Sequence, residues 1–174
     1  MDNVLALFKN VRCFVFDMDG VLTDGSLLLM AGGVWVRRMN IKDGYALQLA
    51  VKKGYKIINI SGSNSDEVKE RLNRLGISEV HMNVKDKSGL LQQVINDESL
   101  KQEEILCMGD DIPDLEILKM ARVACCPADA IAEIKAVSQY ISPVKGGEGC
   151  VRDVIEKVLK LRGDWNNDTS VPSK

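Results

Sequence analysis

Two aspartates separated by one residue carry the strongest chemical signal in this chain of 174 residues. Asp17 and Asp19 follow a strand-like run over residues 11–16 and precede Gly20. Residues two apart on an extended chain point to the same side, so a strand would deliver both carboxylates together. Carboxylates this close repel each other unless a cation or a shared proton lies between them. The alternative is an acidic turn, because Asp-Gly is a common turn pair.

Three further polar loops each follow a strand-like run and precede a helix-like segment. They carry a hydroxyl, a lysine and a second acidic cluster, at Ser61-Gly62, at Lys87, and at Asp110-Asp111 with Asp114. Open α/β sheets bind ligands at the carboxyl ends of their strands, so we expect these loops to meet there. Oxygen ligands from several strands suit Mg²⁺, and a lysine with a hydroxyl beside it suits a phosphoryl group. The plain alternatives are simple helix capping by Ser63 or Asn64 in the first of these loops and a solvated surface lysine for Lys87.

The hydrophobic pattern predicts the sheet that would bring these loops together. Strand-like runs alternate with helix-like segments, the former at 11–16, 55–60, 79–82, 104–108, 122–125 and 139–141, the latter at 43–53, 64–75, 86–96, 112–120, 129–136 and 150–161. Such alternation with short loops predicts an α/β fold with a doubly wound, mainly parallel sheet. In segment 64–75, Asn64 and Glu67 resemble a capping box, and Gly76 supplies the stop.

Residues 26–38 interrupt the alternation. Two apolar runs meet at Gly32-Gly33, which is a hairpin signal. The segment includes Met30 and Trp35 among many apolar residues, and an apolar ribbon that protrudes predicts a partner surface. The alternative is a hairpin folded back on its own sheet.

Composition places the chain among ordinary globular proteins. We expect a single domain over 1–162 and a mobile polar tail over 163–174. A net charge of −2 predicts no nucleic-acid partner, and no apolar run reaches the roughly 18 residues that cross a bilayer. The first ten residues lack a signal-peptide pattern, and five cysteines without a C-x-x-C pair are typical of structural thiols in a reducing compartment. A cytoplasmic location is therefore expected.

Taken in order, the four loops resemble the motifs of haloacid dehalogenase superfamily phosphatases. The matching residues are Asp17-Met18-Asp19-Gly20-Val21-Leu22-Thr23, Ser61, Lys87 and Gly109-Asp110-Asp111-x-x-Asp114. The resemblance covers about residues 11–161 and implies a Rossmann-like fold. The short interval from Asp17 to Ser61 leaves no room for an inserted cap domain. The hairpin and Lys145-Gly146-Gly147-Glu148-Gly149 together resemble the capless tetrameric subgroup, which implies a homotetramer formed through the 26–38 hairpin.

The resemblance also implies a mechanism. Asp17 would be the nucleophile that forms an aspartyl-phosphate, and Asp19 the general acid and base. Mg²⁺ would be held by the Asp17 carboxylate, the Asp19 backbone carbonyl and Asp110. Asp111 or Asp114 would contact the metal through water or support its ligands.

Substrate contacts follow from the same resemblance. Ser61 and Gly62 would bind the transferring phosphoryl group, and Lys87 would neutralise the crowded anions. Arg71 and Arg74 are candidates for binding a substrate carboxylate, because arginine forks match carboxylates. The alternative for both arginines is a solvated helix face.

The resemblance to this subgroup also implies a substrate: the phosphate monoester of an acidic 2-keto-3-deoxy sugar, namely 3-deoxy-D-manno-octulosonate 8-phosphate, with a nonulosonate 9-phosphate as the alternative. Ser63 and Glu148 stand where relatives often carry arginine, which bears on the sugar rather than on the chemistry. Two alternative functions lie outside the phosphatases: a phospho-accepting receiver and an inactive scaffold. Receivers accept phosphate after a later strand, whereas Asp17 follows the first, and the intact motif set argues against a scaffold.

Overall fold

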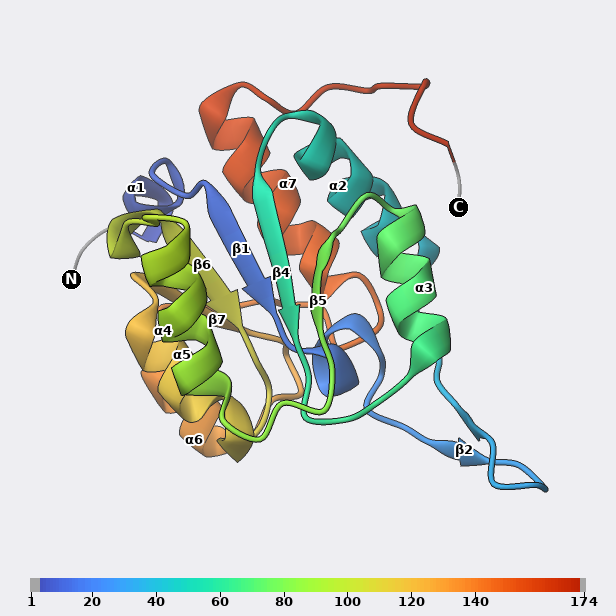
Figure 1. Cartoon of the computed structure of the whole chain (residues 1–174). Coiled ribbons are helices and arrows are strands. Elements are labelled where there is room, and N and C mark those ends of the chain that lie inside the picture. Colours follow the sequence, from blue (N-terminus) through green and yellow to red (C-terminus); the bar gives the residue numbers. More distant parts are fainter. Residues whose placement is uncertain (1–3, 173–174) are drawn as a thin grey trace.

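A parallel sheet of six strands forms the centre of the computed structural model, which describes residues 4–172 (Figure 1). In spatial order the strands are β5 (Glu79–His81), β4 (Lys56–Ile60), β1 (Cys13–Phe16), β6 (Ile105–Met108), β7 (Val123–Cys126) and β8 (Tyr140–Ile141). Every neighbouring pair is parallel, so the predicted doubly wound sheet is confirmed. The two central strands are β1 and β6, which places Asp17 near the middle of the carboxyl edge.

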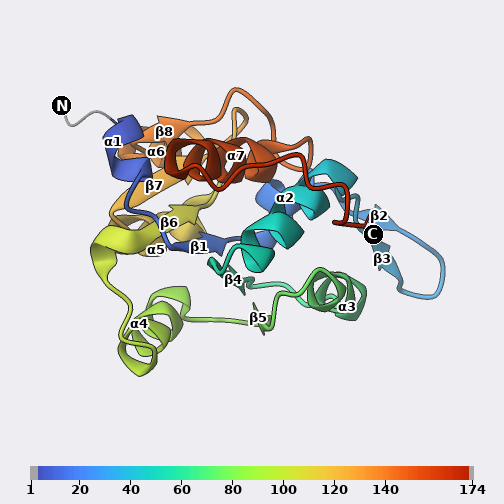
Figure 2. The ribbon, with the colours of Figure 1, turned by 90° about the horizontal axis from the view of Figure 1, so that it is seen from above.

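Helices cover both faces of this sheet (Figure 2). One layer contains α1 (Val4–Phe8), α2 (Ile41–Lys52), α3 (Asp66–Arg74) and α7 (Cys150–Arg162), and the other contains α4 (Lys87–Asp97), α5 (Leu115–Met120) and α6 (Ala132–Val137). Alternate residues of β1 serve the two cores, because Phe14 and Phe16 face the first layer while Cys13 and Val15 face the second. All five cysteines are buried and unpaired, as expected of structural thiols.

Helix starts differ from the sequence expectation at several points. The predicted capping box of Asn64 and Glu67 is wrong, because α3 begins at Asp66 with Ser65 as its cap. The Ser65 hydroxyl accepts from the Val68 N–H at 3.3 Å and donates to Glu67 at 3.1 Å. The segment predicted at 112–120 opens with a 3₁₀ turn over Ile112–Asp114, and α1 was not predicted at all.

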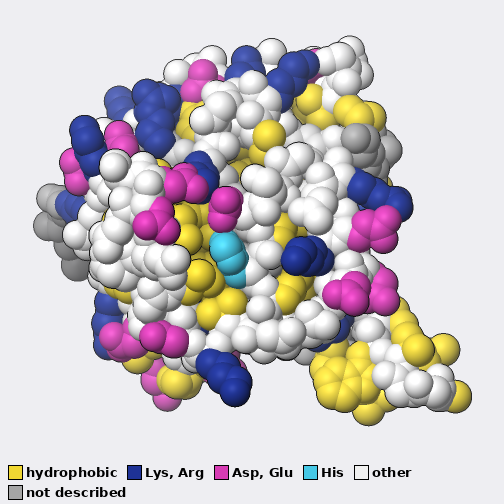
Figure 3. All heavy atoms as spheres, viewed as in Figure 1, with side chains coloured by type: hydrophobic (Ala, Val, Ile, Leu, Met, Phe, Trp, Pro, Cys, Tyr) yellow, Lys and Arg dark blue, Asp and Glu magenta, His cyan; other side chains and the backbone are white. Residues whose placement is uncertain are grey.

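The hairpin forms a separate two-stranded sheet that projects from the body (Figures 1 and 3). It pairs β2 (Leu28–Leu29) with β3 (Trp35–Val36) in antiparallel register. Its apolar side chains are 43–66% exposed, namely those of Leu27, Leu28, Leu29, Met30, Val34, Trp35 and Val36. The alternative of a hairpin packed on its own sheet is therefore wrong for the single chain.

The segment after α7 lies along α2. Lys52 Nζ contacts Asp168 Oδ2 at 2.6 Å, and the Tyr45 hydroxyl donates to the Asn166 carbonyl at 3.3 Å. The mobility of the tail over 163–174 stays a prediction. The first residues of the predicted domain, 1–3, and the last residues of the predicted tail, 173–174, lie outside the described residues. Within residues 4–172, no helix has the length and apolar character needed to cross a membrane.

Candidate active site

Loops that follow four strands meet in one cavity of about 340 Å³ at the carboxyl edge of the sheet. Its lining residues are Asp17, Asp19, Gly25, Ser61, Gly62, Ser63, Lys87, Asp110, Asp111, Pro113 and Asp114. Each of the four loops singled out from the sequence contributes to this lining. Parallel strands explain the convergence, because all their carboxyl ends lie at one edge.

Lys87 connects two of the aspartates. As the first residue of α4, its Nζ lies 2.6 Å from Asp17 Oδ1 and 2.7 Å from Asp114 Oδ1. The three side chains are at most 8% exposed, so little water screens these charges. Burial lowers the pKa of Lys87, but the charges of Asp17 and Asp114 outweigh burial and hold that pKa above its usual value. The lysine is therefore a fixed cation inside the site.

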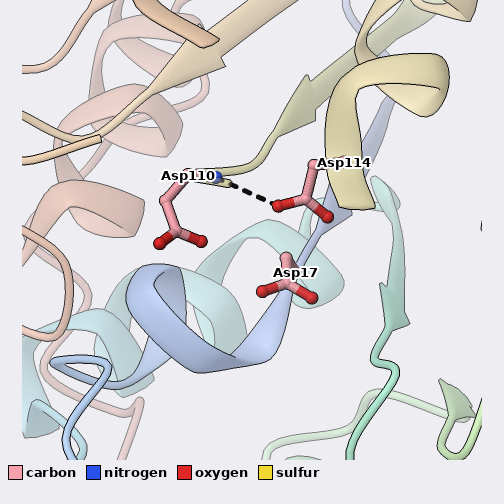
Figure 4. Close-up of side chains that lie close together, drawn as sticks. All are labelled: Asp17, Asp110 and Asp114. Carbon is pink, nitrogen blue, oxygen red and sulfur yellow. Dashed lines mark hydrogen bonds between the residues drawn. The ribbon is translucent and has the colours of Figure 1, made fainter. Parts of the chain in front are cut away.

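The two partners of this lysine, Asp17 and Asp114, lie close to a third carboxylate, that of Asp110 (Figure 4). Oxygen atoms of Asp17, Asp110 and Asp114 all lie within 4.8 Å of one another. Burial, with the charge of Asp114, raises the pKa of Asp17 to about 7 although Lys87 opposes the shift. Burial, with the charges of Asp17, Asp114 and Asp111, likewise raises the pKa of Asp110 to about 7. The single positive charge of Lys87 therefore does not balance the three carboxylates. Asp17 and Asp110 retain protons up to about pH 7 instead.

Asp110 and Asp17 suit a divalent cation better than Asp114 does. The Asp114 carboxylate already accepts from Lys87 through Oδ1 and from the Asp110 N–H through Oδ2 at 3.1 Å (Figure 4). Among the described residues, no hydrogen-bond donor reaches the Asp110 carboxylate, and Lys87 bonds only Oδ1 of Asp17. Free oxygens in an all-oxygen donor set fit Mg²⁺.

A glycine makes room for Asp110. Gly20 has φ +90°, and a Cβ there would lie 2.1 Å from Asp110 Oδ2. Behind the same loop, a Cβ on Gly146 would lie 1.9 Å from the Gly20 carbonyl oxygen, and the Gly147 N–H donates to Val21 at 3.0 Å. The glycine-rich segment before α7 therefore supports the backbone of the Asp17 loop.

Asp19 lines the same cavity but is held from another direction. Arg37 contacts both of its oxygens, with Nε 2.8 Å from Oδ1 and Nη2 3.2 Å from Oδ2. The Thr23 hydroxyl donates to Asp19 Oδ1 at 3.2 Å. Lys87 and Arg37 thus serve different carboxylates.

Ser61 is 1% exposed at the end of β4. Its hydroxyl oxygen accepts from the Ser63 N–H at 3.1 Å, which leaves its proton available to a phosphoryl oxygen. The loop is fixed to the one before α4, since the Ser61 carbonyl accepts from Val84 and the Ser63 carbonyl from Asn83. The helix after this loop begins at Asp66 rather than at the predicted residue 64, so Ser61 lies five residues before α3.

Comparisons with known proteins agree with this geometry. Residues 75–154 match the family model of haloacid dehalogenase-like hydrolases, a stretch that includes Lys87 and Asp110. A probable YrbI family phosphatase from Pseudomonas syringae is 30% identical, with 92% of each chain covered and a TM-score of 0.89. The chain belongs to the haloacid dehalogenase superfamily.

Two other superfamily relatives carry more specific names. The 3-deoxy-D-manno-octulosonate 8-phosphate phosphatase KdsC of Yersinia pestis is 26% identical over 166 residues, covering 93% of this chain and 89% of that protein. The phosphatase of the same name from Moraxella catarrhalis is 29% identical, with 94% of each chain covered and a TM-score of 0.90. That crystal structure is a complex with a magnesium ion, a phosphate ion and 3-deoxy-D-manno-octulosonate (Kdo).

Some residues predicted for this superfamily site lie elsewhere in the single chain. Arg71 and Arg74 line a groove along α3 with Glu67 and Glu70, outside the cavity. Asp111, by contrast, lines the cavity but is exposed, and its Oδ1 accepts from the Ile112 N–H at 2.8 Å.

Arg37 and Thr23 contact Asp19, and reasoning from the sequence assigned a role to neither of them. Thr23 was seen only as part of a motif. The only sequence signal for a functional arginine here is the pair Arg37-Arg38 directly after an apolar run. This signal does not show which of the two arginines points inward.

Proposed function

We propose that this protein is a Mg²⁺-dependent phosphoric monoester hydrolase that converts Kdo 8-phosphate into Kdo and phosphate. The observation that carries the proposal is the buried Asp17, which lies between Lys87 and the free carboxylate of Asp110 in one cavity. A nucleophile, a fixed cation and an all-oxygen metal site are what phosphoryl transfer requires. The relatives named for Kdo 8-phosphate, which match over nine-tenths of this chain, support the substrate.

The first half-reaction uses Asp17 and Asp19. A carboxylate oxygen of Asp17 attacks phosphorus, the bond from phosphorus to the sugar oxygen breaks, and an aspartyl-phosphate forms. Asp19 donates a proton to the departing sugar alkoxide. This covalent route divides one difficult displacement into two easier ones.

In the second half-reaction the same groups act in reverse. Asp19 accepts a proton from a water molecule as that water attacks phosphorus, and the bond to Asp17 breaks to release phosphate and the free carboxylate. Alternating acid and base duties on one carboxyl group contribute about 10²–10⁴-fold in enzymes.

Lys87 and Ser61 hold the phosphoryl group between these steps. The Lys87 ammonium offsets the repulsion between Asp17 and a phosphate dianion, and the Ser61 hydroxyl donates to a phosphoryl oxygen. Bound through Asp17, the Asp19 carbonyl and Asp110, Mg²⁺ would supply further charge neutralisation and polarise the phosphate.

The hairpin supports a homotetramer in this proposal. Its exposed apolar face would pack against a neighbouring copy and cover the open side of a cavity that has no cap domain. A neighbouring subunit would also be the route by which Arg71 or Arg74 reaches a substrate carboxylate. A cytoplasmic location is proposed on the five unpaired cysteines.

Phosphate release with Mg²⁺ from Kdo 8-phosphate and from a nonulosonate 9-phosphate, measured side by side, tests the proposal. Preference for Kdo 8-phosphate that is lost in Asp17→Asn is the expected result. Preference for the nonulosonate ester would move the protein to the alternative substrate with the same mechanism. Equal background rates for the wild type and Asp17→Asn on both esters would overturn the assignment.

A further inference from the structure

We propose that Arg37 is a positioning residue for Asp19, and that it ties the orientation of this carboxylate to the hairpin. The inference rests on the proposed function only for the acid–base role of Asp19. The contact itself is a feature of the fold.

Arg37 forms a bidentate ion pair with Asp19, which we call the clamp. Nε and Nη2 of Arg37 reach separate oxygens of Asp19, at 2.8 and 3.2 Å. Parallel bonds from a planar guanidinium fix the plane of a carboxylate, which a single contact cannot do. The Arg37 side chain is only 4% exposed, whereas that of Asp19 is 28% exposed toward the cavity. The arginine therefore stands behind the carboxylate and leaves it facing the site.

Charge explains why a second cation is needed. Five aspartates line the cavity, and the one cation in the lining, Lys87, is already bound to Asp17 and Asp114. Within residues 4–172, Arg37 is the cation whose ion pair reaches Asp19. Without it, Asp19 would lie among like charges, which push carboxylates apart.

The neighbouring arginine shows that the clamp is specific. Arg38 pairs with Asp24 through a side chain that is 69% exposed, as ordinary surface pairs are. Arg37 directly follows β3, whose Trp35 is 58% exposed on the hairpin. It also lines a groove of about 370 Å³ that includes Trp35 and Arg71. A shift of the hairpin therefore moves the group that holds Asp19.

Leaving-group chemistry separates positioning from other roles. A sugar alkoxide must be protonated as it departs, whereas 4-nitrophenolate is stable enough to leave without a proton. Loss of Asp19 orientation should therefore slow the first turnover on Kdo 8-phosphate but spare the burst of nitrophenolate from 4-nitrophenyl phosphate.

Arg37→Gln is the test variant and Arg38→Gln its matched control. We expect Arg37→Gln to slow the single-turnover rate on Kdo 8-phosphate on the order of 100-fold, with KM and the aryl burst rate within about threefold of wild type. Arg37→Lys should recover part of the loss, and Arg38→Gln should match wild type. A raised KM with an unchanged rate would overturn the proposal in favour of substrate binding by Arg37. Equal losses on both esters would overturn it in favour of a general structural role.

A second readout needs no activity and so separates this proposal from the proposed function. The Nε–H proton of Arg37, assigned by its absence in Arg37→Gln, should give a slowly exchanging NMR signal in the intact protein. The signal should disappear in Asp19→Ala and persist in Asp24→Ala. This result would support the clamp even if wild type hydrolysed neither ester, and a signal indifferent to Asp19→Ala would overturn it.

Discussion

Lys87 Nζ lies 2.6 Å from Asp17 Oδ1, and this contact joins residues 70 positions apart in the chain. Both side chains are 8% exposed, so the pair lies where water screens charge poorly. The lysine sits at the first position of α4, where the helix dipole disfavours a cation. The carboxylates of Asp17 and Asp114 compensate for that cost, and α4 is thereby tied to the centre of the sheet.

Replacing Lys87 with methionine keeps most of the length of the side chain and removes its charge. We expect kcat to fall at least 100-fold, because Asp17 would then face the phosphate dianion without its cation. Breaking a buried ion pair on one side costs about 3–5 kcal/mol, so the free energy of unfolding should also fall. Urea unfolding and steady-state kinetics measure both effects. Lys85→Met on the exposed part of the same loop is the control, and an equal effect there would contradict the interpretation.

Mg²⁺ should stabilise the protein through Asp110. At a hundredfold excess over its dissociation constant, a ligand of the native state adds about 2.7 kcal/mol, or a rise in Tm of about 5–10 °C for a chain of this size. Asp110→Asn should abolish the rise, whereas Asp111→Asn should keep it. Thermal unfolding with Mg²⁺ and with a chelator measures this. A rise that survives Asp110→Asn would place the metal elsewhere.

Gly20→Ala should disable the metal site by pressing on Asp110. Its methyl group would meet the Asp110 carboxylate at 2.1 Å. Gly54→Ala is the matched control, because Gly54 has φ +82° and open space around its Cβ position. Both variants should lose about 1–2 kcal/mol from backbone strain, which unfolding experiments measure. Only Gly20→Ala should also weaken Mg²⁺ binding measured by calorimetry; equal affinities in the two variants would refute the steric argument.

Asp43 should make stability depend on pH. This carboxyl group at the start of α2 is 2% exposed, accepts from the Arg152 N–H at 2.7 Å, and has an Oδ2 without a hydrogen-bond partner. Burial raises its pKa to about 6, although the Arg152 N–H and charge oppose the shift. Between about pH 4 and 6 the folded state thus binds a proton that the unfolded state has lost, so stability falls as pH rises. The contribution is about 3 kcal/mol.

Asp43→Asn removes this titration while keeping an acceptor for Arg152. The difference in unfolding free energy between wild type and variant, measured from pH 4 to 7, should move in favour of the variant as pH rises and level off above pH 6. A difference that stays constant over this range would contradict the assignment.

The hairpin should control assembly. We expect wild type to sediment as a tetramer and the double variant Leu29→Ser, Trp35→Ser as smaller species, because these two residues are paired on the exposed ribbon. Ile141→Ser, which alters a comparably exposed apolar residue on β8, should leave the mass unchanged. A wild-type monomer at micromolar concentration would argue against a hairpin interface.

Most of the fold was predictable because its strands are apolar runs between polar loops. The run before Asp17 and the run before Asp110 both became buried central strands, for which periodicity and flanking residues agree. Helix starts were harder to predict, since several capping residues compete over a few positions. In 63–65, Ser63, Asn64 and Ser65 are all able to cap, and the backbone selects Ser65.

The cavity itself was predictable from residue types at strand ends, but its supports were not. The sequence does not distinguish the surroundings of Asp111 from those of Asp114, and only the turn at Ile112 buries Asp114 and leaves Asp111 exposed at the cavity. Residues 34–38 carry no polar–apolar alternation, so nothing in them tells which arginine turns inward. The contact between Arg37 and Asp19 depends on how the hairpin leaves the body, which is tertiary information.

The placing of β1 between β4 and β6 has a consequence for biosynthesis. Asp17 is translated before the residues that hold it, because its backbone N–H donates to the Met108 carbonyl and the Val21 carbonyl in the same loop accepts from the Cys150 thiol, 129 residues later. A nascent chain that has reached Met108 but not residues 147–150 therefore carries the two aspartates on a loop that still lacks its contacts with the segment before the last helix. The catalytic edge is completed only once translation has reached the last helix.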